Sequence, residues 1–405
     1  MKRLTDVIVH DIFSPPVASR IYAYSSIAAF EIMQHDDESY LPLTGQLRGL
    51  QNVPLPEEDK EYCFPLAATH AFLLTGKALI FSESKIEEFH NEKLKEFEAL
   101  NMPSNVYQHS IDYGEAVSKH VLAWSGKYNY KESRTFSKYS FQDDPATWQP
   151  TPPAYMDGIE PHWREIRPMV LDSAQQFTPP PPTPYDMNKN SKFYKELMEV
   201  YKALEADDKE DRIAIAQFWD CNPYVSHSVG HVMFATKKIT PGGHWVGITD
   251  IACRKSDANM VQTSEAYARV SIALMDAFIS CWDEKYRSNL VRPETVINQS
   301  LDSEWKPALQ TPPFPEYTSG HSVISTAAAY ALTDIFGENF AYIDSVEVEY
   351  GLPPREFNSF LEASQEAAVS RLYGGIHYRP AIDLGVEQGK EVGQFLLKNL
   401  KTRNN

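Results

Sequence analysis

Eleven prolines lie between Pro145 and Pro184, including the uninterrupted run from Pro179 to Pro182. Because proline has no backbone N–H and a fixed φ, this segment cannot form a regular helix or an inner strand. The same segment holds large aromatic residues, including Trp148 and Trp163, which a freely exposed linker would not carry. We therefore predict an extended segment that packs on the surface of the protein.

Helical hydrophobic periodicity dominates on both sides of this segment, whereas alternation of period two is scarce. The helices expected before it are 4–13, 18–33, 65–81, 84–100 and 105–124. Those expected after it are 188–204, 208–219, 224–236, 256–282, 322–336, 354–371 and 379–400. The prediction is an all-α protein of two helical bundles joined by a proline-rich connector. Its parts are an N-terminal helical half (1–127), the connector (128–187) and a C-terminal helical half (188–405).

The charge balance excludes some classes of partner. Lysine and arginine number 38 against 55 acidic residues, which gives a net charge of −17, and no long basic run occurs. Nucleic acid and anionic membranes are therefore not expected as partners. The sequence has no run of 18 apolar residues, so we expect no transmembrane segment. Its four cysteines show no CxxC spacing, and buried free thiols are the favoured interpretation.

Three short stretches in the C-terminal half carry residues suited to binding an anion. Lys285 and Arg292 stand seven residues apart, Ser-Gly-His occupies 319–321, and Arg371 precedes His377 by six residues across a Gly-Gly pair. Together they supply many hydrogen-bond donors and no carboxylate. That composition is typical of a pocket for a compact tetrahedral oxyanion.

The expected helix ends would bring these stretches together. Ser319 and Gly320 lie just before a predicted helix, where free backbone N–H groups favour negative charge. Arg371 is expected to end one helix and His377 to precede the next, while Lys285 and Arg292 are expected to follow the helix ending near 282. We therefore predict that several polar helix ends meet around one anion.

In this order and at these spacings, the stretches resemble the three-part signature shared by vanadium-dependent haloperoxidases and the type-2 phosphatidic acid phosphatase superfamily. One departure is Thr318, where the usual pattern has proline. Phe314, five residues before the serine, is similar to the haloperoxidase version of the signature. Trp282, three residues before Lys285, matches the place of a tryptophan beside the halide in fungal chloroperoxidases and bacterial iodoperoxidases.

The resemblance implies vanadate as the cofactor, with phosphate able to occupy the same site. It implies that His377 binds vanadium through a ring nitrogen, that His321 is the acid–base group, and that Lys285 polarises the bound peroxide. Five groups would hold the equatorial oxygens: Lys285, Arg292, Ser319, the Gly320 N–H and Arg371.

Further assignments concern the surroundings of the anion. Trp282 and Phe314 are expected to form an apolar halide pocket, with Tyr224 as a looser candidate, although aromatic residues near helix ends commonly serve only as core. By resemblance, Asp220 is expected to pair with Arg292; the alternative is an ordinary residue at a helix C-terminus.

His227 and His231 stand four residues apart on a predicted helix, a spacing that can bind zinc. No glutamate follows His227 as an HExxH motif requires, and a satisfied core pair is the favoured interpretation.

The resulting hypothesis is an enzyme that oxidises iodide or bromide with hydrogen peroxide to a hypohalous acid, which then acts on small organic acceptors. One alternative is a soluble acid phosphatase, with His377 as the phosphorylated nucleophile and His321 protonating the leaving group. Another is an anion-binding protein without turnover. Monomer and homodimer both stay open. No apolar signal-peptide core follows Met1, so we expect a cytoplasmic protein, or an exported bacterial one (periplasmic or extracellular) if a signal peptide has been removed.

Overall fold

The computed structural model describes residues 1–229 and 232–404. Its N-terminal part is a bundle of helices. They are α1 (Lys2–His10), α2 (Pro15–Met33), α3 (Phe64–Lys77), α4 (Glu83–Glu98) and α5 (Ser104–Ser125). Prolines in the first turns of α2 and α3 occupy positions where a backbone N–H has no intrahelical partner. Helix α3 packs against α2, α4 and α5, which closes this bundle.

The proline-rich segment that follows is extended but packed. It contains only the short helices α6 (Tyr130–Ser133) and η2 (Trp163–Glu165) before α7 begins. The side chains of Trp148 and Trp163 are fully buried. Backbone N–H groups of residues 169–171 donate to the buried carboxylate of Asp276, at 2.6–3.0 Å. These contacts fix the segment against the helical core.

The C-terminal part is a second helical bundle with two small antiparallel sheets. Its helices are α7 (Lys192–Tyr201), α8 (Lys209–Phe218), α9 (Pro241–Lys255), α10 (Met260–Ser288), α11 (Pro293–Ser300), α12 (Gly320–Phe336), η3 (Val346–Tyr350), α13 (Phe360–Tyr373) and α14 (Arg379–Asn399). The strands are β1 (Val225–Val229), β2 (Val232–Thr236), β3 (Tyr342–Asp344) and β4 (Arg355–Phe357). Helix α12 packs against α9, α10, α13 and α14.

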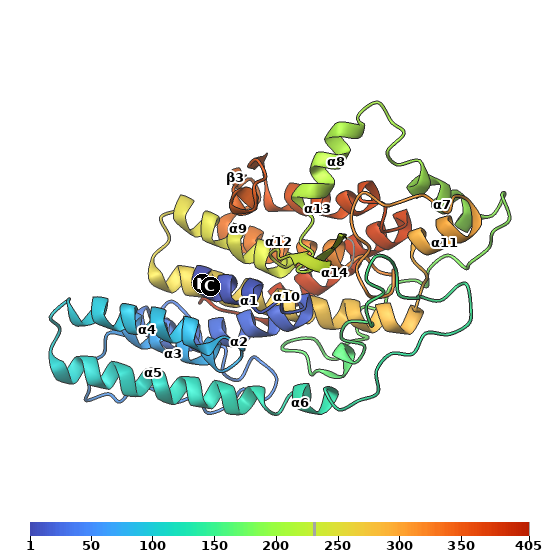
Figure 1. Ribbon diagram of the computed structural model, residues 1–405. Helices are drawn as coiled ribbons and strands as arrows, with labels where there is room; N and C mark the ends of the chain where they lie inside the picture. Colours follow the sequence, from blue (N-terminus) through green and yellow to red (C-terminus); the bar gives the residue numbers. More distant parts are fainter. Residues whose placement is uncertain (230–231, 405) are drawn as a thin grey trace.

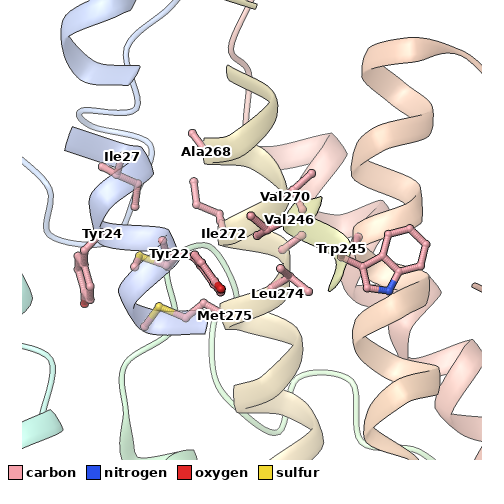
Figure 2. Packing of buried hydrophobic residues seen from close by; sticks show 14 of the residues in the cluster. Tyr22, Tyr24, Ile27, Trp245, Val246, Ala268, Val270, Ile272, Leu274 and Met275 are labelled. Atoms are coloured by element: carbon pink, nitrogen blue, oxygen red, sulfur yellow. The ribbon is translucent and has the colours of Figure 1, made fainter. Parts of the chain in front are cut away.

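Helix α10 joins the two bundles. It is 29 residues long and buried around most of its circumference, as expected for a helix in the interior of a large protein. In Figure 1 the blue and cyan helices lie on one side of α10, and most of the yellow to red helices lie on the other. Figure 2 shows Tyr22 and Ile27 of α2 facing α10 from one side and Trp245 of α9 beyond it. The predicted all-α fold of two helical bundles is confirmed.

The predicted helix 224–236 is wrong. This stretch forms a hairpin in which β1 pairs with β2, with Val225 opposite Thr236. Valine and threonine prefer the extended backbone because of their branched Cβ atoms, and pairing of the strands satisfies that preference. The predicted placement of His227 and His231 on one face of a helix therefore has no support. Residue 227 lies in β1, and His231 lies outside the described residues.

Helix α9 was missed because glycines weaken its helical pattern. A Cβ atom on Gly243 would lie 2.6 Å from Cγ1 of Ile239, and one on Gly247 would lie 2.6 Å from Cγ2 of Val346. The glycines therefore permit close packing of α9, which compensates for their low helix propensity. Among the described helices, none has both the length and the hydropathy needed to cross a membrane.

Candidate active site

The three anion-binding stretches meet at helix ends. Ser319 caps α12, Arg292 precedes α11, Arg371 lies in the last turn of α13, and His377 lies just before α14. The position of Lys285 differs from the prediction that it follows the helix. Helix α10 continues to residue 288, which places this lysine in the last turn. All five side chains are buried, with at most 2% of their surface exposed.

The turn before α14 depends on glycine. Gly375 has φ +75°, a left-handed conformation that side chains other than glycine rarely adopt. A Cβ atom at this position would also lie 3.1 Å from both Trp305 and Pro307. The Gly-Gly pair therefore allows the chain to reverse tightly between Arg371 and His377.

His377 is held as a neutral imidazole with a defined tautomer. Its Nδ1 lies 2.9 Å from Oε1 of Glu316, and its Nε2 lies 3.2 Å from Nη1 of Arg292. A guanidinium only donates, so Nε2 accepts and the ring proton resides on Nδ1, which donates to Glu316. Burial lowers the pKa of His377 well below its usual value, and the charges of Arg292 and Lys285 lower it further. The Nε2 lone pair therefore points to Arg292, and Arg292 Nη1 must release it before Nε2 can bind a metal.

Glu316, which the signature residues do not include, is fully buried beside His377 and accepts from its second nitrogen. Its Oε1 also accepts the N–H of Tyr378 at 2.8 Å. Burial raises the pKa of Glu316 to about 7, while Arg292 and the Tyr378 N–H act in the opposite direction. A metal-binding imidazole needs a hydrogen-bond acceptor on its second nitrogen, and this requirement could have indicated a nearby carboxylate.

Arg292 is positioned by backbone carbonyls and keeps one free group. Its Nε donates to the carbonyl of Phe314 at 2.9 Å, and its Nη1 donates to that of Ile376 at 2.8 Å. Its Nη2 is buried and has no hydrogen-bond partner among the described residues. Burial lowers the pKa of Arg292 to about 10. An anion next to Nη2 would accept the missing hydrogen bond and would offset the free-energy cost of burying the guanidinium charge.

Arg371 and Lys285 are also held by carbonyl groups. Arg371 donates through Nη2 to Trp219 O at 2.7 Å, and burial lowers its pKa to about 10. The ammonium of Lys285 donates to the carbonyls of Pro315, Glu316 and Thr318 at 3.1, 3.1 and 2.5 Å. Burial lowers the pKa of Lys285 to about 8. An ammonium has three N–H groups, so Lys285 must release one carbonyl before it can bind an anion.

The N-terminus of α12 presents two further donors, the Ser319 O–H and the Gly320 N–H, and one acceptor, His321 Nε2. The Ser319 Oγ accepts the N–H of Ser322 at 3.3 Å, which leaves its own O–H available to donate. The space in front of Gly320 is open, because a Cβ atom there would meet nothing nearer than a Trp282 ring atom at 3.7 Å. His321 Nε2 is buried without a partner among the described residues.

His321 is a neutral base in this structure. Burial lowers its pKa well below the usual value, Arg371 and His244 lower it further, and a hydrogen bond to the backbone of Trp219 opposes them. Nε2 has no hydrogen-bond partner among the described residues, so it is available to exchange a proton.

A cavity of about 160 Å³ opens onto Gly320, His321, Arg371 and His377. Its wall includes all three aromatic residues predicted to line a halide pocket: Trp282, Phe314 and Tyr224. The rings of Trp282 and Phe314 lie 5.0 Å apart, and the Lys285 ammonium lies 5.0 Å from the centre of the Phe314 ring. The structure thus places an apolar wall next to buried cations.

Asp220 lines the same cavity, but its predicted pairing with Arg292 is wrong. Its Oδ2 lies 2.6 Å from the ammonium of Lys238, in the segment between β2 and α9. Its charge raises the pKa of Arg371, so the arginine that it supports electrostatically is the one on α13. Sequence spacing could not distinguish between the two arginines.

Comparison with known proteins identifies the family. The model of the VCPO second helical-bundle domain matches residues 265–405. The solved structure of a bacterial vanadium-dependent iodoperoxidase is 52% identical, covers 100% of this chain and 96% of its own, and superposes with a TM-score of 0.94. The chain belongs to the vanadium-dependent haloperoxidases. It is therefore an enzyme that uses vanadate to oxidise halide with peroxide.

Bacterial vanadium-dependent chloroperoxidases share the fold of this haloperoxidase at much lower identity. A holo form is 16% identical with a TM-score of 0.72, and an apo form is 17% identical with a TM-score of 0.70. Each covers 96% of this chain, and 93% and 95% of its own chain, respectively. A search of curated proteins gives no match.

The buried donors of this haloperoxidase fit vanadate. Arg292 Nη2 lacks a partner, Gly320 leaves open space before a helix N-terminus, and His377 Nε2 presents a lone pair. His321 Nε2 supplies a neutral acceptor. Vanadate bound here would accept hydrogen bonds from Arg292 Nη2 and the Gly320 N–H, and His377 Nε2 would be its protein ligand.

Glu316→Gln should weaken vanadate binding by about 10–100-fold, as is typical when the partner of a metal-binding histidine is replaced. Glutamine accepts less strongly from Nδ1–H and so reduces the basicity of Nε2. Because the pKa of Glu316 is about 7, its carboxylate is lost as pH falls through that value, and the wild-type affinity should weaken there. The measurement is calorimetric titration with orthovanadate at several pH values.

The matched control for this variant is Glu31→Gln, which changes a buried glutamate hydrogen-bonded to Thr44 in the N-terminal part. This control should keep the wild-type affinity and its pH dependence. Equal affinities and pH profiles for Glu316→Gln and the wild type would remove the positioning role of Glu316.

Proposed function

We propose that iodide is the preferred halide and that oxidation takes place in the cavity between the C-terminal end of α10 and the N-terminal end of α12. The observation that carries this proposal is the apolar wall of Trp282 and Phe314 beside buried cations. Iodide is large, weakly hydrated and readily oxidised, so an apolar wall costs it less desolvation than it costs a smaller halide. The name of the 52% identical relative, an iodoperoxidase, supports the same choice.

Binding of the cofactor is assigned to the buried donors. Arg292, Arg371 and Ser319, together with the Gly320 N–H, would hold oxyanion oxygens, and His377 Nε2 would be the protein ligand of the metal. Bound vanadate supplies a Lewis-acidic centre that activates peroxide without a change of oxidation state. A bound anion would also stabilise the charged forms of both arginines, whose pKa values burial lowers to about 10.

Proton transfer is assigned to His321. Its neutral Nε2 can accept the proton that hydrogen peroxide loses on binding. Lys285 would then release one of its three carbonyls and donate to the oxygen that the halide attacks. The hypohalous acid formed would leave through the cavity and react with small organic acceptors.

Phe314→Ala is expected to raise the KM for iodide by about 5–30-fold, with a smaller change in kcat. Loss of the ring removes apolar contact equivalent to roughly 1–2 kcal/mol and admits water beside the cations. Steady-state iodide oxidation measures both constants. Phe340→Ala, in the aromatic cluster with Phe336 and Phe360, is the matched control and should keep the wild-type KM. Unchanged iodide kinetics in Phe314→Ala would exclude this ring from the halide site.

A paired assay on one vanadate-free preparation tests the proposed function. One arm contains orthovanadate, hydrogen peroxide and either iodide or bromide, and the other contains a phosphomonoester without vanadate. We expect iodide oxidation that requires vanadate, is suppressed by phosphate, and exceeds bromide oxidation in kcat/KM. Faster bromide oxidation would overturn the halide preference. Phosphomonoester hydrolysis without halide oxidation would reassign the chemistry of the pocket.

A further inference from the structure

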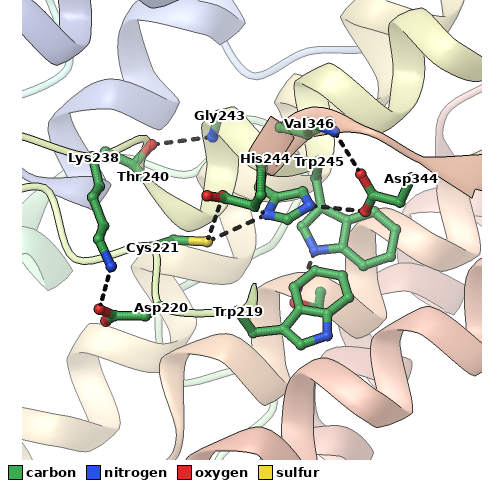
Figure 3. Close-up of polar contacts among 12 residues, drawn as sticks. Trp219, Asp220, Cys221, Lys238, Thr240, Gly243, His244, Trp245, Asp344 and Val346 are labelled. Carbon is green, nitrogen blue, oxygen red and sulfur yellow. Dashed lines mark hydrogen bonds and ion pairs between the residues drawn. The ribbon is translucent and has the colours of Figure 1, made fainter. Parts of the chain in front are cut away.

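A buried cluster of ionisable side chains lies where the segment after α8, helix α9 and the β3–η3 segment meet. Its members are Cys221, His244, Asp344 and Glu347, and at most 2% of the surface of each is exposed. Figure 3 shows the imidazole of His244 between Cys221 on one side and Asp344 on the other. None of these four side chains takes part in the halide chemistry proposed above.

The two nitrogens of His244 have different surroundings. Nε2 lies 2.8 Å from Oδ2 of Asp344. Nδ1 lies 3.4 Å from the Cys221 sulfur and 3.2 Å from Oε1 of Glu347, and those two atoms are 3.9 Å apart. The Trp219 ring stacks on the imidazole at 4.6 Å and 20°, which fixes its plane. One sulfur, one nitrogen and one oxygen therefore converge on a common point.

We propose that Cys221, His244 and Glu347 form a zinc site that lies beside the vanadate pocket and shares no ligand with it. Zinc bonds of about 2.0–2.3 Å in tetrahedral geometry place neighbouring ligand atoms roughly 3.3–3.6 Å apart. The three separations in this cluster, 3.2, 3.4 and 3.9 Å, fit that geometry with small shifts of the side chains. A set of thiolate, imidazole and carboxylate ligands favours zinc over magnesium or calcium.

Asp344 contacts Nε2, the nitrogen of the His244 imidazole that does not face Cys221 and Glu347. A histidine that binds zinc commonly donates its second N–H to a carboxylate, which fixes the tautomer and strengthens the ligand nitrogen. Asp344 Oδ2 is placed to accept that proton from Nε2 of His244, and its other oxygen accepts the N–H of Val346 at 3.0 Å. Cys221 also lines the cavity, so water can supply the fourth ligand.

The zinc would fix a backbone segment that the active site uses. Cys221 lies two residues after Trp219, whose carbonyl accepts a hydrogen bond from Arg371 at 2.7 Å. Anchoring Cys221 to α9 and η3 through a metal would hold that carbonyl in place. Removal of zinc is therefore expected to lower the Tm and to reduce turnover as well.

Elemental analysis of the vanadate-loaded protein, after gel filtration in metal-free buffer, tests the site. We expect about one zinc per chain, because three protein side chains, one of them a thiolate, would hold the metal through purification. Cys221→Ser and Glu347→Gln should lose most of the zinc. Cys253→Ser changes another buried free thiol outside the cluster and should retain it. His377→Ala should also retain it, since the metal is not in the vanadate pocket.

Cobalt reconstitution keeps the test decisive if the cluster variants fold poorly. Wild-type protein treated with a zinc chelator and then titrated with cobalt should develop the absorption band of a thiolate–cobalt bond, saturating at about one equivalent. Absence of both zinc and this band in the wild type would overturn the proposal and make the cluster an ion pair of His244 with its two carboxylates. Zinc retained by folded Cys221→Ser and Glu347→Gln would also overturn it.

Discussion

Vanadate binding and halide oxidation are both expected to disappear in a His377→Ala variant. The Nε2 atom of His377 is the proposed metal ligand, and its tautomer is fixed by Glu316 and Arg292. Replacing the partner of a metal-binding histidine typically costs 10–100-fold in affinity, so removing the ligand itself should cost more than about a hundredfold. Calorimetric titration with orthovanadate measures the affinity, and iodide oxidation measures the turnover.

The variant also leaves Glu316 buried without its imidazole partner, so the stability of the fold must be checked separately. His70→Ala is a matched control, because His70 is a buried histidine of α3 that contacts His90 in the N-terminal part. Thermal unfolding without vanadate compares both variants with the wild type. Vanadate-dependent turnover at the wild-type level in folded His377→Ala would exclude His377 as the ligand.

His321→Ala is expected to bind vanadate within a few fold of the wild type but to lose about 10²–10⁴-fold in kcat, the usual contribution of a positioned acid–base group. His321 lines the cavity, and its Nε2 has no partner among the described residues, so it is free to accept a proton. The same titration and iodide assay give both quantities. His70→Ala again serves as the control, and normal turnover in His321→Ala would remove the acid–base assignment.

The pH dependence of the wild type gives a second readout of His321. Burial and the neighbouring Arg371 hold the pKa of this histidine well below its usual value. The neutral base is therefore present above that depressed pKa and is lost only as pH falls through it. We expect the acidic limb of wild-type kcat against pH to lie well below the usual histidine range and to be absent in His321→Ala.

The fold and the anion-binding stretches could be predicted from the sequence because their signals are local. Helical periodicity identified most helices, and prolines marked the segment that is not helical. The hairpin of β1 and β2 and helix α9 were not found, because strand pairing and close packing, which hydrophobic periodicity does not report, determine these structures. Strand pairing stabilises the hairpin, and close contacts at Gly243 and Gly247 stabilise the helix.

The parts of the site that were missed depend on distances between chain segments. Glu316 lies between Phe314 and Ser319, which were both predicted to be in the site. Only the fold shows that its carboxylate contacts His377. Asp220 pairs with Lys238 because the hairpin returns the chain to the end of α8. The cluster around His244 combines three segments that are more than 100 residues apart at their extremes and carries no motif.

The burial of α10 within both bundles has a consequence for the evolution and engineering of this enzyme. Residues of α2 cover one side of α10, and α9 and α12 cover the other. A fragment that carries only the catalytic signature would therefore expose a long apolar surface to water and would be prone to aggregation. The N-terminal helices thus keep this surface of the catalytic half out of water, and exchange of modules between relatives would have to transfer both bundles together.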